Sequence, residues 1–283
     1  MKPPEFIEGL ALIAEHYDAL LCDAWGVIHN GVDLFDHVEK AMTTFRKKGR
    51  PLVILTNAPR PSSVIPAQLD RLGLSRDAYD AIVTSGDATQ AEIKKRAGKR
   101  AYRLGPEKDD ALYSGTEAIF APIEEADYII CTGLEHDQTE VPEEYRPMLK
   151  AAAERGLEMI CANPDIVVNW GGRIVYCAGA LAQIFAEEGG RVIFGGKPHK
   201  PIYDVALDRL NAVAGRPIDL DKILVVGDGI ATDIKGANNA GLDALFIGGE
   251  GGIHEAATDS NAIEVLFKEE NVHAQYAMQA LKW

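Results

Sequence analysis

Short runs of apolar residues alternate along the chain with stretches in which apolar positions recur every three or four residues. The first pattern is typical of buried strands and the second of amphipathic helices. Asp36–Lys48 shows the helical pattern, because Val38, Met42 and Phe45 lie roughly one turn apart and Gly49 follows as a stop signal. The alternation of the two patterns predicts an α/β protein with parallel sheets and helical crossovers.

The two ends of the chain and its middle each carry this alternation. The ends contain predicted strands at Ala19–Cys22, Leu52–Leu55, Val192–Phe194, Ile223–Val226 and Ala244–Ile247 and helices at Ile202–Val213 and Ile234–Ala240. The middle contains predicted strands at Ala81–Val83, Arg100–Leu104, Tyr128–Cys131 and Glu158–Cys161 and helices at Asp87–Arg96, Glu143–Arg155 and Ala178–Glu188. The middle is long enough for a domain of its own, about 110 residues. We therefore expect one domain from residues 1–79 and 190–283, and a second from residues 80–189.

Composition and charge exclude several classes of protein. The 283 residues include 29 Lys and Arg against 43 Asp and Glu, so the net charge of −14 argues against binding to nucleic acid or to an anionic membrane surface. No uncharged apolar run approaches the roughly 18 residues of a membrane span, and Glu8 interrupts the apolar stretch near the N-terminus. The four cysteines are far apart in sequence, which disfavours a disulfide scaffold or a zinc site. These features predict a cytoplasmic protein.

The polar residues that follow the predicted strands are the candidates for chemistry. They are Asp23, the pair Thr56-Asn57, Lys197, and Asp228 with Asp233. Each alone also fits an ordinary turn, helix cap or surface loop. Together they would meet at the carboxyl ends of parallel strands, where α/β sheets bind ligands. Carboxylates there suit a divalent cation, and a lysine suits a phosphate group.

Four segments resemble the four motifs of the haloacid dehalogenase (HAD) superfamily of phosphatases, and they occur in the same order. The segments are CDAWGVIHNG, ILTNAPR, GGKPHKP and VVGDGIATDIKGA. The long insert between the second and third resembles the α/β cap of the class IIA branch, as do Asn163–Asp165 and Cys177–Leu181. The resemblance implies a Rossmann-like three-layer core with a parallel sheet, and an inserted cap that sets substrate specificity.

The resemblance also implies roles for residues at the phosphate site. Asp23 would be the nucleophile that becomes an aspartyl phosphate, which divides one difficult displacement into two easier steps. Thr56 would donate its hydroxyl to a phosphoryl oxygen beside the backbone N–H of Asn57. Lys197 would neutralise phosphate charge and orient Asp23, and Ala24 would lie against the phosphate.

A magnesium site is implied by the same resemblance. Asp23, Asp228 and the backbone carbonyl of Trp25 would ligate Mg²⁺, and Asp233 would hold the waters of the metal or Lys197. Trp25 is also expected to contact the substrate. Asp165, in the cap, is expected to contact it from the other side.

Trp25 departs from the pattern of the family. Phosphatases of this kind have Asp two residues after the nucleophile, where it protonates the leaving oxygen and later activates water. Tryptophan cannot titrate near neutral pH, so general acid–base assistance of about 10²–10⁴-fold is in question. His29 and His199 are candidate substitutes, as is a substrate whose leaving group needs no proton. Packing of Trp25 against the cap is the structural alternative.

The sequence thus predicts a Mg²⁺-dependent phosphohydrolase that acts on a small phosphorylated metabolite through an aspartyl phosphate. The alternatives are a phosphate-ester binding protein with little turnover and a phosphotransferase-like enzyme, because the usual carboxylate is replaced by Trp25. A cap-to-cap homodimer is an arrangement that the sequence leaves open.

Overall fold

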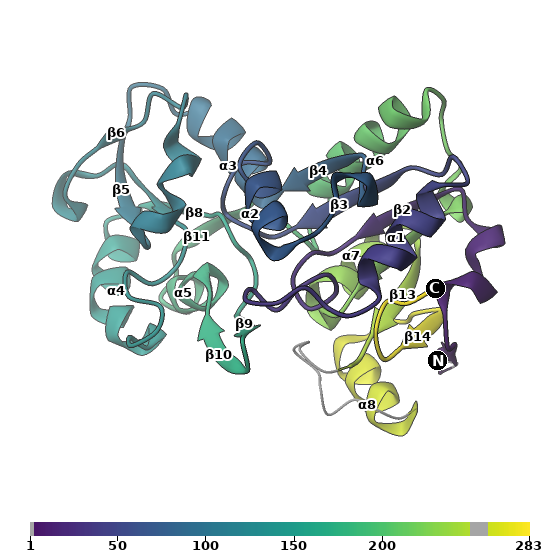
Figure 1. The fold of residues 1–283 in the computed structure, drawn as a ribbon. Coiled ribbons are helices and arrows are strands. Elements are labelled where there is room, and N and C mark those ends of the chain that lie inside the picture. Colours follow the sequence, from purple (N-terminus) through teal and green to yellow (C-terminus); the bar gives the residue numbers. More distant parts are fainter. Residues whose placement is uncertain (1–2, 250–259) are drawn as a thin grey trace.

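The computed structural model describes residues 3–249 and 260–283 and consists of two lobes that lie side by side (Figure 1). The core lobe is built on a seven-stranded sheet and contains both termini. The inserted lobe is built on a five-stranded sheet from the middle of the chain. Both are parallel sheets with helices on their faces, so the predicted α/β class and Rossmann-like architecture are confirmed.

The core sheet has the strand order β1-β14-β13-β12-β2-β3-β4. From β2 the chain adds β3 and β4 on one side, and after the insertion it adds β12, β13 and β14 on the other. The order therefore reverses between β2 and β12, which is where open α/β sheets form a ligand crevice. The bounds are β1 (Glu5–Phe6), β2 (Ala19–Cys22), β3 (Leu52–Thr56), β4 (Ala81–Thr84), β12 (Ile223–Gly227), β13 (Asp243–Ile247) and β14 (Tyr276–Met278).

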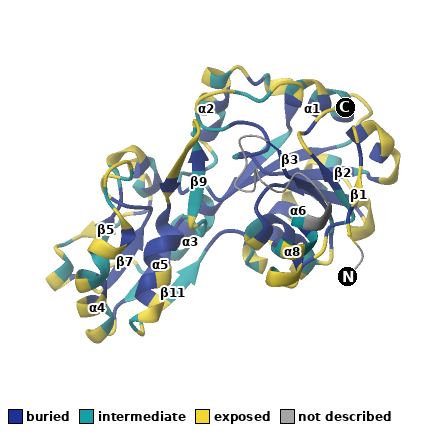
Figure 2. Cartoon of the chain, turned by 90° about the horizontal axis from the view of Figure 1, so that it is seen from below, coloured by how far each residue is buried: buried dark blue, intermediate teal, exposed yellow. Residues whose placement is uncertain are grey.

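Helices cover both faces of the core sheet, which explains why its central strands are apolar throughout (Figure 2). Leu20 faces the side of α1 (Val38–Arg46) and α2 (Ile65–Leu72), where Met42 and Phe45 are fully buried. Leu21 faces the opposite side, which is covered by α6 (Lys200–Ala214), α7 (Lys235–Ala240) and α8 (Ser260–Glu270).

The inserted lobe has the strand order β11-β8-β7-β5-β6. Its strands are β5 (Arg100–Leu104), β6 (Ile119–Phe120), β7 (Tyr128–Cys131), β8 (Glu158–Cys161) and β11 (Arg191–Phe194). Side chains of α4 (Arg146–Glu154) and α5 (Ala178–Glu187) form the larger of its two apolar clusters, and α3 (Ser85–Lys94) contributes to the other. Short 3₁₀ helices occur at Leu10–Leu12, Ala14–His16, Arg76–Ala78, Glu107–Tyr113, Ile123–Glu125, Pro142–Tyr145 and Leu220–Lys222.

A β-hairpin extends from the inserted lobe toward the core lobe. Its strands, β9 (Val167–Trp170) and β10 (Arg173–Tyr176), pair antiparallel. The two-residue turn between them is Gly171-Gly172, with φ angles of 55° and 85°. Two-residue hairpin turns favour positive φ at both positions, so glycine suits each of them.

Two strands belong to other sheets than the domain boundaries expected near residues 80 and 190 imply. Ala81–Thr84 pairs with β3 in the core sheet, and Arg191–Phe194 pairs with β8 in the sheet of the inserted lobe. The sequence identified both segments as strands but assigned each to the wrong sheet. The physical reason is that an apolar pattern shows that a strand is buried without showing which neighbour it pairs with.

Two global expectations can be compared with the structure. Within the described ranges, none of the helices is long and apolar enough to cross a membrane. All four cysteines are free and buried.

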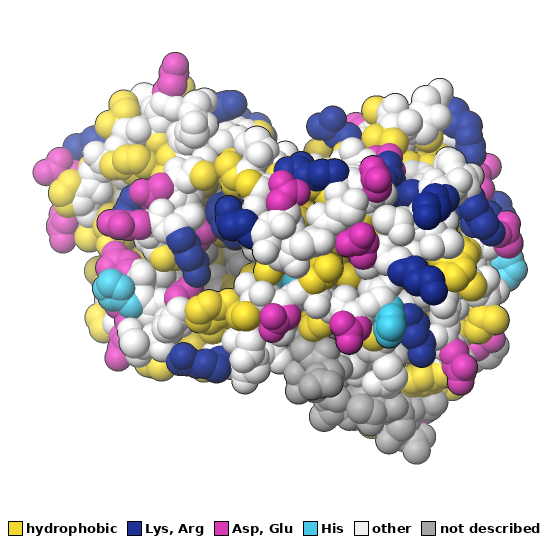
Figure 3. Space-filling model, viewed as in Figure 1, with side chains coloured by type: hydrophobic (Ala, Val, Ile, Leu, Met, Phe, Trp, Pro, Cys, Tyr) yellow, Lys and Arg dark blue, Asp and Glu magenta, His cyan; other side chains and the backbone are white. Residues whose placement is uncertain are grey.

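On the face seen in Figure 3, basic and acidic side chains are intermixed over both lobes, and the surface is hollowed where the lobes meet.

Candidate active site

Three neighbouring strands bring predicted site residues to one edge of the core sheet. Asp23 follows β2, Thr56 ends β3, and Asp228 follows β12. Strand β2 pairs with both β3 and β12, and the backbone N–H of Asp23 donates to Val226 O at 2.8 Å. These side chains therefore meet at the carboxyl edge, beside the reversal of strand order.

Asp233 reaches the same place from a single π turn, Ile230–Ile234, between β12 and α7. Such turns often mark functional sites. Gly227 permits the close approach, because a Cβ there would lie 2.2 Å from the Asp233 side chain. Asp233 Oδ2 in turn accepts the backbone N–H of Gly229 at 3.1 Å.

Lys197 lies between two of these carboxylates. Its ammonium group donates to Asp23 Oδ1 at 2.6 Å, Asp233 Oδ1 at 2.7 Å and the backbone carbonyl of Leu55 at 3.1 Å. An ammonium group has three N–H donors, so all of its hydrogen bonds are satisfied. Lys197 comes from the loop after β11, a strand of the other sheet, and thus crosses between the lobes.

The ionic cluster is almost inaccessible to solvent. Lys197 is 2% exposed, and Asp23 is 7% exposed. Burial, followed by the charge of Asp233, raises the pKa of Asp23 well above its usual value. Burial acts to lower the pKa of Lys197, but the charges of Asp23 and Asp233 outweigh it, so that pKa is held well above its usual value. The two carboxylates therefore stabilise the charged form of Lys197.

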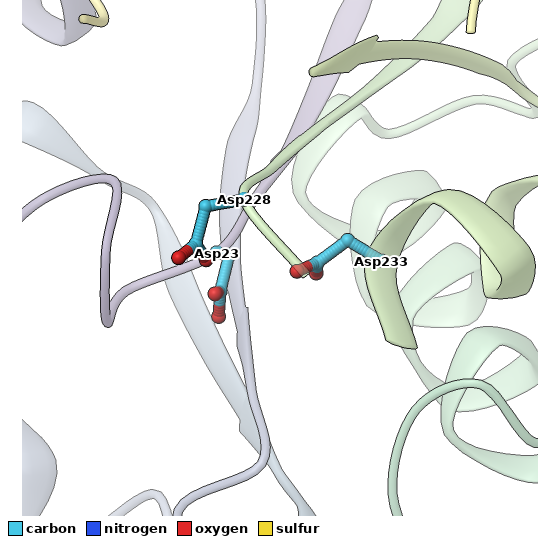
Figure 4. A group of neighbouring side chains, drawn as sticks. All are labelled: Asp23, Asp228 and Asp233. Atoms are coloured by element: carbon cyan, nitrogen blue, oxygen red, sulfur yellow. The ribbon is translucent and has the colours of Figure 1, made fainter. Parts of the chain in front are cut away.

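Asp23, Asp228 and Asp233 fit a hard divalent cation. Each offers a carboxylate oxygen, and these oxygens lie within 4.8 Å of one another (Figure 4). Figure 4 shows the three side chains converging from two strand ends and the following turn. When all three are ionised they face one ammonium group, which leaves an excess of two negative charges in a buried space. Oxygen ligands and this charge suit Mg²⁺.

Asn57 links the core site to the inserted lobe. Its Oδ1 accepts the backbone N–H of Lys197 at 2.7 Å, and its Nδ2 donates to Asp165 Oδ1 at 2.9 Å. Burial raises the pKa of Asp165. Asp165 thus lies at the site, and the Asn57 side chain holds the two loops together. Thr56 Oγ1 accepts the backbone N–H of Ala58 at 3.2 Å, so the Thr56 hydroxyl hydrogen is available to another acceptor.

Trp25 contacts the hairpin of the inserted lobe. Its indole N–H donates to the carbonyl of Asn169 in β9 at 2.8 Å. Beside it, the backbone N–H of Gly171 donates to Asn30 O at 3.2 Å. The Trp25 side chain therefore links the two lobes, which is the packing role that the sequence left open for it.

The two candidate histidines differ in position. His29 is 3% exposed and its Nδ1 accepts the backbone N–H of Gly31 at 3.0 Å. Burial, with a smaller effect of Arg60, lowers the pKa of His29 to about 4, so it is neutral at pH 7 and carries its hydrogen on Nε2. His199 stacks on Phe194 with ring centres 4.8 Å apart, and burial lowers its pKa.

A cavity of about 320 Å³ lies between the lobes and is lined by Ala24, which follows Asp23, and by Thr56. This volume is within the roughly 300–1,000 Å³ range of small-molecule sites. Four residues predicted for substrate contact line it, namely Ala24, Trp25, Thr56 and Asp165. Sequence reasoning missed further lining residues, among them Arg60, Lys108, Asp109, Asp137 and Trp170. Arg60 is the last residue of the second motif, but no sequence signal joins it to the others.

An ion pair bridges the lobes at this cavity. Arg60 Nε lies 3.6 Å from Asp109 Oδ1, and Asp109 is 3% exposed. Burial raises the pKa of Asp109 to about 6, although Arg60 and Lys108 act in the opposite direction and Asp137 adds to the rise. The buried carboxyl therefore costs the folded state some stability when it is ionised.

Replacing Lys197 by Met should destabilise the protein strongly. Asp23 and Asp233 would lose their buried counter-ion, so we expect the free energy of unfolding to fall by about 3–5 kcal/mol. Chemical denaturation without divalent cations measures this. The added change Asp233→Asn should recover part of the loss. The exposed neighbour Lys200→Met is the control, expected within about 0.5 kcal/mol of the wild type. Equal effects of the two lysine variants would contradict this interpretation.

Asp109 should give the protein a specific pH dependence. The folded-state pKa is raised, to about 6 from a usual 3.8. The stabilising contribution of the protonated group is therefore complete below the unfolded pKa and is lost as pH rises through 6. We expect the stability of Asp109→Asn relative to wild type to increase by about 2–3 kcal/mol between pH 4 and pH 7. Denaturation curves of both proteins across this pH range measure the difference in their free energies of unfolding. A difference that does not change with pH would contradict the prediction.

Comparisons with known proteins agree with this geometry. Residues 20–118 match the family described as haloacid dehalogenase-like hydrolase, and residues 194–266 match one described as HAD-hydrolase-like. A crystal structure of a haloacid dehalogenase-like family hydrolase from Brucella suis 1330 is 39% identical, with a TM-score of 0.89, over 98% of this chain and 100% of that one.

Two curated relatives are more distant in sequence. A 5'-nucleotidase of Bacillus subtilis is 26% identical, and an acid sugar phosphatase of Staphylococcus aureus is 24% identical. Both matches cover 82% of this chain and 87% of the relative. Together with the matched families and the strand-end cluster, these likenesses show that the chain belongs to the haloacid dehalogenase-like hydrolase family and is an enzyme of its phosphatase group.

Proposed function

We propose that this enzyme is a Mg²⁺-dependent phosphohydrolase that acts on a small phosphomonoester through an aspartyl phosphate on Asp23. The observation that carries the proposal is the position of Lys197 between Asp23 and Asp233, with Asp228 completing an acidic triad. This cluster lies next to the cavity between the lobes, since Ala24 and Thr56 line that cavity. A nucleophile, a fixed cation and a metal site are thus adjacent to a space for substrate.

Asp23 would attack phosphorus with the carboxylate oxygen that Lys197 does not hold. Lys197 binds Oδ1, which leaves Oδ2 for the attack. The bond between phosphorus and the leaving oxygen breaks as the bond to Asp23 forms, and the leaving oxygen takes up a proton. Water then attacks phosphorus, releases inorganic phosphate and restores the Asp23 carboxylate.

The remaining groups would bind and orient the phosphate. Lys197 neutralises negative charge, and the Thr56 hydroxyl donates a hydrogen bond to a phosphoryl oxygen. Backbone N–H groups at Ala24 and Asn57 lie on the same strand-end loops and suit the other oxygens. Asp23, Asp228 and the Trp25 carbonyl would hold Mg²⁺, with Asp233 beside them, and the ion would supply charge that stabilises the developing oxyanions.

The arrangement most resembles the class IIA branch, with Trp25 in place of the second carboxylate of the first motif. Because His29 is neutral at pH 7, it offers a hydrogen-bond donor in the cavity rather than a cationic acid. We therefore propose that esters with acidic leaving groups are hydrolysed faster than alkyl esters. In other enzymes, general acid–base catalysis increases the reaction rate by about 10²–10⁴-fold.

The inserted lobe is proposed to select the substrate, since Asp165, Asp109 and Trp170 reach the cavity from it. The relatives named a 5'-nucleotidase and an acid sugar phosphatase make small nucleotide and sugar phosphates the first esters to assay. A homodimer joined through the inserted lobe remains a further proposal, which sedimentation would test.

Replacing Asp23 by Asn should abolish phosphate release. Loss of the nucleophile should lower kcat by at least about 10³-fold, as in other enzymes that form covalent intermediates. The assay is Mg²⁺-dependent release of p-nitrophenol and phosphate from p-nitrophenyl phosphate. Asp208→Asn, in the exposed part of α6, is the matched control and should keep wild-type activity.

The alternatives give different results in the same assay. A binding protein would bind the ester without release by the wild type. A phosphotransferase-like enzyme would release p-nitrophenol in a burst, with phosphate appearing slowly unless an acceptor is added. Retained turnover in Asp23→Asn would show that the chemistry does not pass through this carboxylate.

A further inference from the structure

Two tryptophans form one wall of the cavity between the lobes. Trp25 comes from the loop after β2, and Trp170 ends β9 in the hairpin. Both rings lie against the same glycine: a Cβ on Gly31 would be 2.4 Å from Trp170 Cδ1 and 2.5 Å from Trp25 Cη2. Indole rings from different lobes are therefore neighbours and form a continuous surface, which we term the tryptophan wall.

The Trp25 ring is fixed in place. Its N–H donates to the carbonyl of Asn169 at 2.8 Å, and its edge meets the His29 ring with centres 5.2 Å apart at 69°. Gly31 has a φ of 88°, a left-handed conformation that favours glycine, so the backbone beneath the rings is specialised as well. A wall that is already ordered loses little conformational entropy when a ligand stacks on it.

The charged groups of the cavity are largely paired with one another. Lys108 forms an ion pair with Asp137, and Arg60 faces Asp109 at 3.6 Å. Arg60 also donates to Gln68 Oε1 at 2.8 Å. The two charges within each pair offset each other, so the cavity does not favour a second phosphate or carboxylate on the substrate.

Most of the surface exposed in the cavity is apolar, although the polar residues Gln68, Thr132, Gln138 and Asn163 also line it. The apolar lining includes Ala58, Pro59, Ile65, Val168 and Val175. A sugar ring lying on the tryptophan wall would find no donor at Trp25, because the Trp25 N–H is already used by Asn169. A planar aromatic ring needs few hydrogen-bond partners and gains from stacking on indole.

We propose that the organic part of the substrate is a planar aromatic ring that stacks on the tryptophan wall, with Trp25 and Trp170 as the residues that determine this specificity. The inference rests on the proposed function, because it assigns a substrate class to the same site. The phosphate end would face Ala24 and Thr56, and the ring would lie along the wall.

Benzyl phosphate and cyclohexylmethyl phosphate provide a matched test. Both are esters of primary alcohols, so they differ in the planarity of the ring and little in the leaving group. We expect kcat/KM to be about three- to tenfold higher for benzyl phosphate, the range of one aromatic stacking contact. The two corresponding phosphonates, which cannot be hydrolysed, should show the same preference in Kd by calorimetry with Mg²⁺ present.

Variants of Trp170 test the assignment of the wall. In Trp170→Leu, the two esters should have nearly equal kcat/KM and the two phosphonates nearly equal Kd. Trp170→Phe should keep most of the preference because it retains an aromatic face. A thermal unfolding midpoint near that of the wild type would show that each variant is folded. If Trp170→Leu does not fold, the two phosphonate affinities of the wild type still measure the preference. Trp170→Phe and Trp170→Tyr then show whether it changes with the aromatic side chain at this position.

The outcomes separate this inference from the proposed function. Equal affinities for the two phosphonates, failure of both to bind, or faster hydrolysis of glucose 6-phosphate than of benzyl phosphate would overturn the aromatic preference. Hydrolysis of p-nitrophenyl phosphate in those cases would leave the phosphatase proposal standing. The expected phosphonate preference without any ester hydrolysis would support the aromatic site and overturn the phosphatase proposal.

Discussion

The burial of one lysine between two carboxylates is the constraint on which the site depends. Lys197 is 2% exposed, and its three hydrogen bonds reach Asp23, Asp233 and the backbone of β3. A buried ammonium group is tolerated only when it is paired and fully hydrogen-bonded. The relative positions of the strand ends, the π turn at Asp233 and the loop after β11 therefore determine whether these hydrogen bonds form.

The same cluster connects the two lobes. Lys197 enters the core site from the sheet of the inserted lobe, and Asn57 binds both the backbone of Lys197 and Asp165. Trp25 adds a third link through Asn169. A shift of the inserted lobe would thus disturb the nucleophile and the cavity together. Trp25, in the loop after β2, thus contributes to the interface between the lobes.

The sequence alone was sufficient for the fold class and for the strand-end residues, because both follow from local patterns. Buried strands are short apolar runs, and Asp23, Thr56 and Asp228 directly follow or end such runs. Pairing partners were not predictable, so Ala81–Thr84 and Arg191–Phe194 were assigned to the wrong sheets.

Contacts between the lobes cannot be predicted from local sequence patterns either, because they depend on how two separately folded surfaces meet. Arg60 and Asp109 carry no shared sequence signal. The hairpin could have been found, since Gly171-Gly172 separates two short runs rich in β-branched and aromatic residues. Its contact with Trp25 could not, because the indole donor binds a backbone carbonyl that any residue would supply.

The proposed function depends on one cation site formed by Asp23, Asp228 and Asp233, whose negative charge would exceed the positive charge of Lys197. Calorimetric titration of Mg²⁺ into the wild-type protein and into Asp228→Asn tests it most directly. We expect a single site in the wild type and binding at least about tenfold weaker in the variant, as found when groups that support metal sites are replaced. Equal Mg²⁺ affinity in the two proteins, or no Mg²⁺ binding by the wild type, would contradict it.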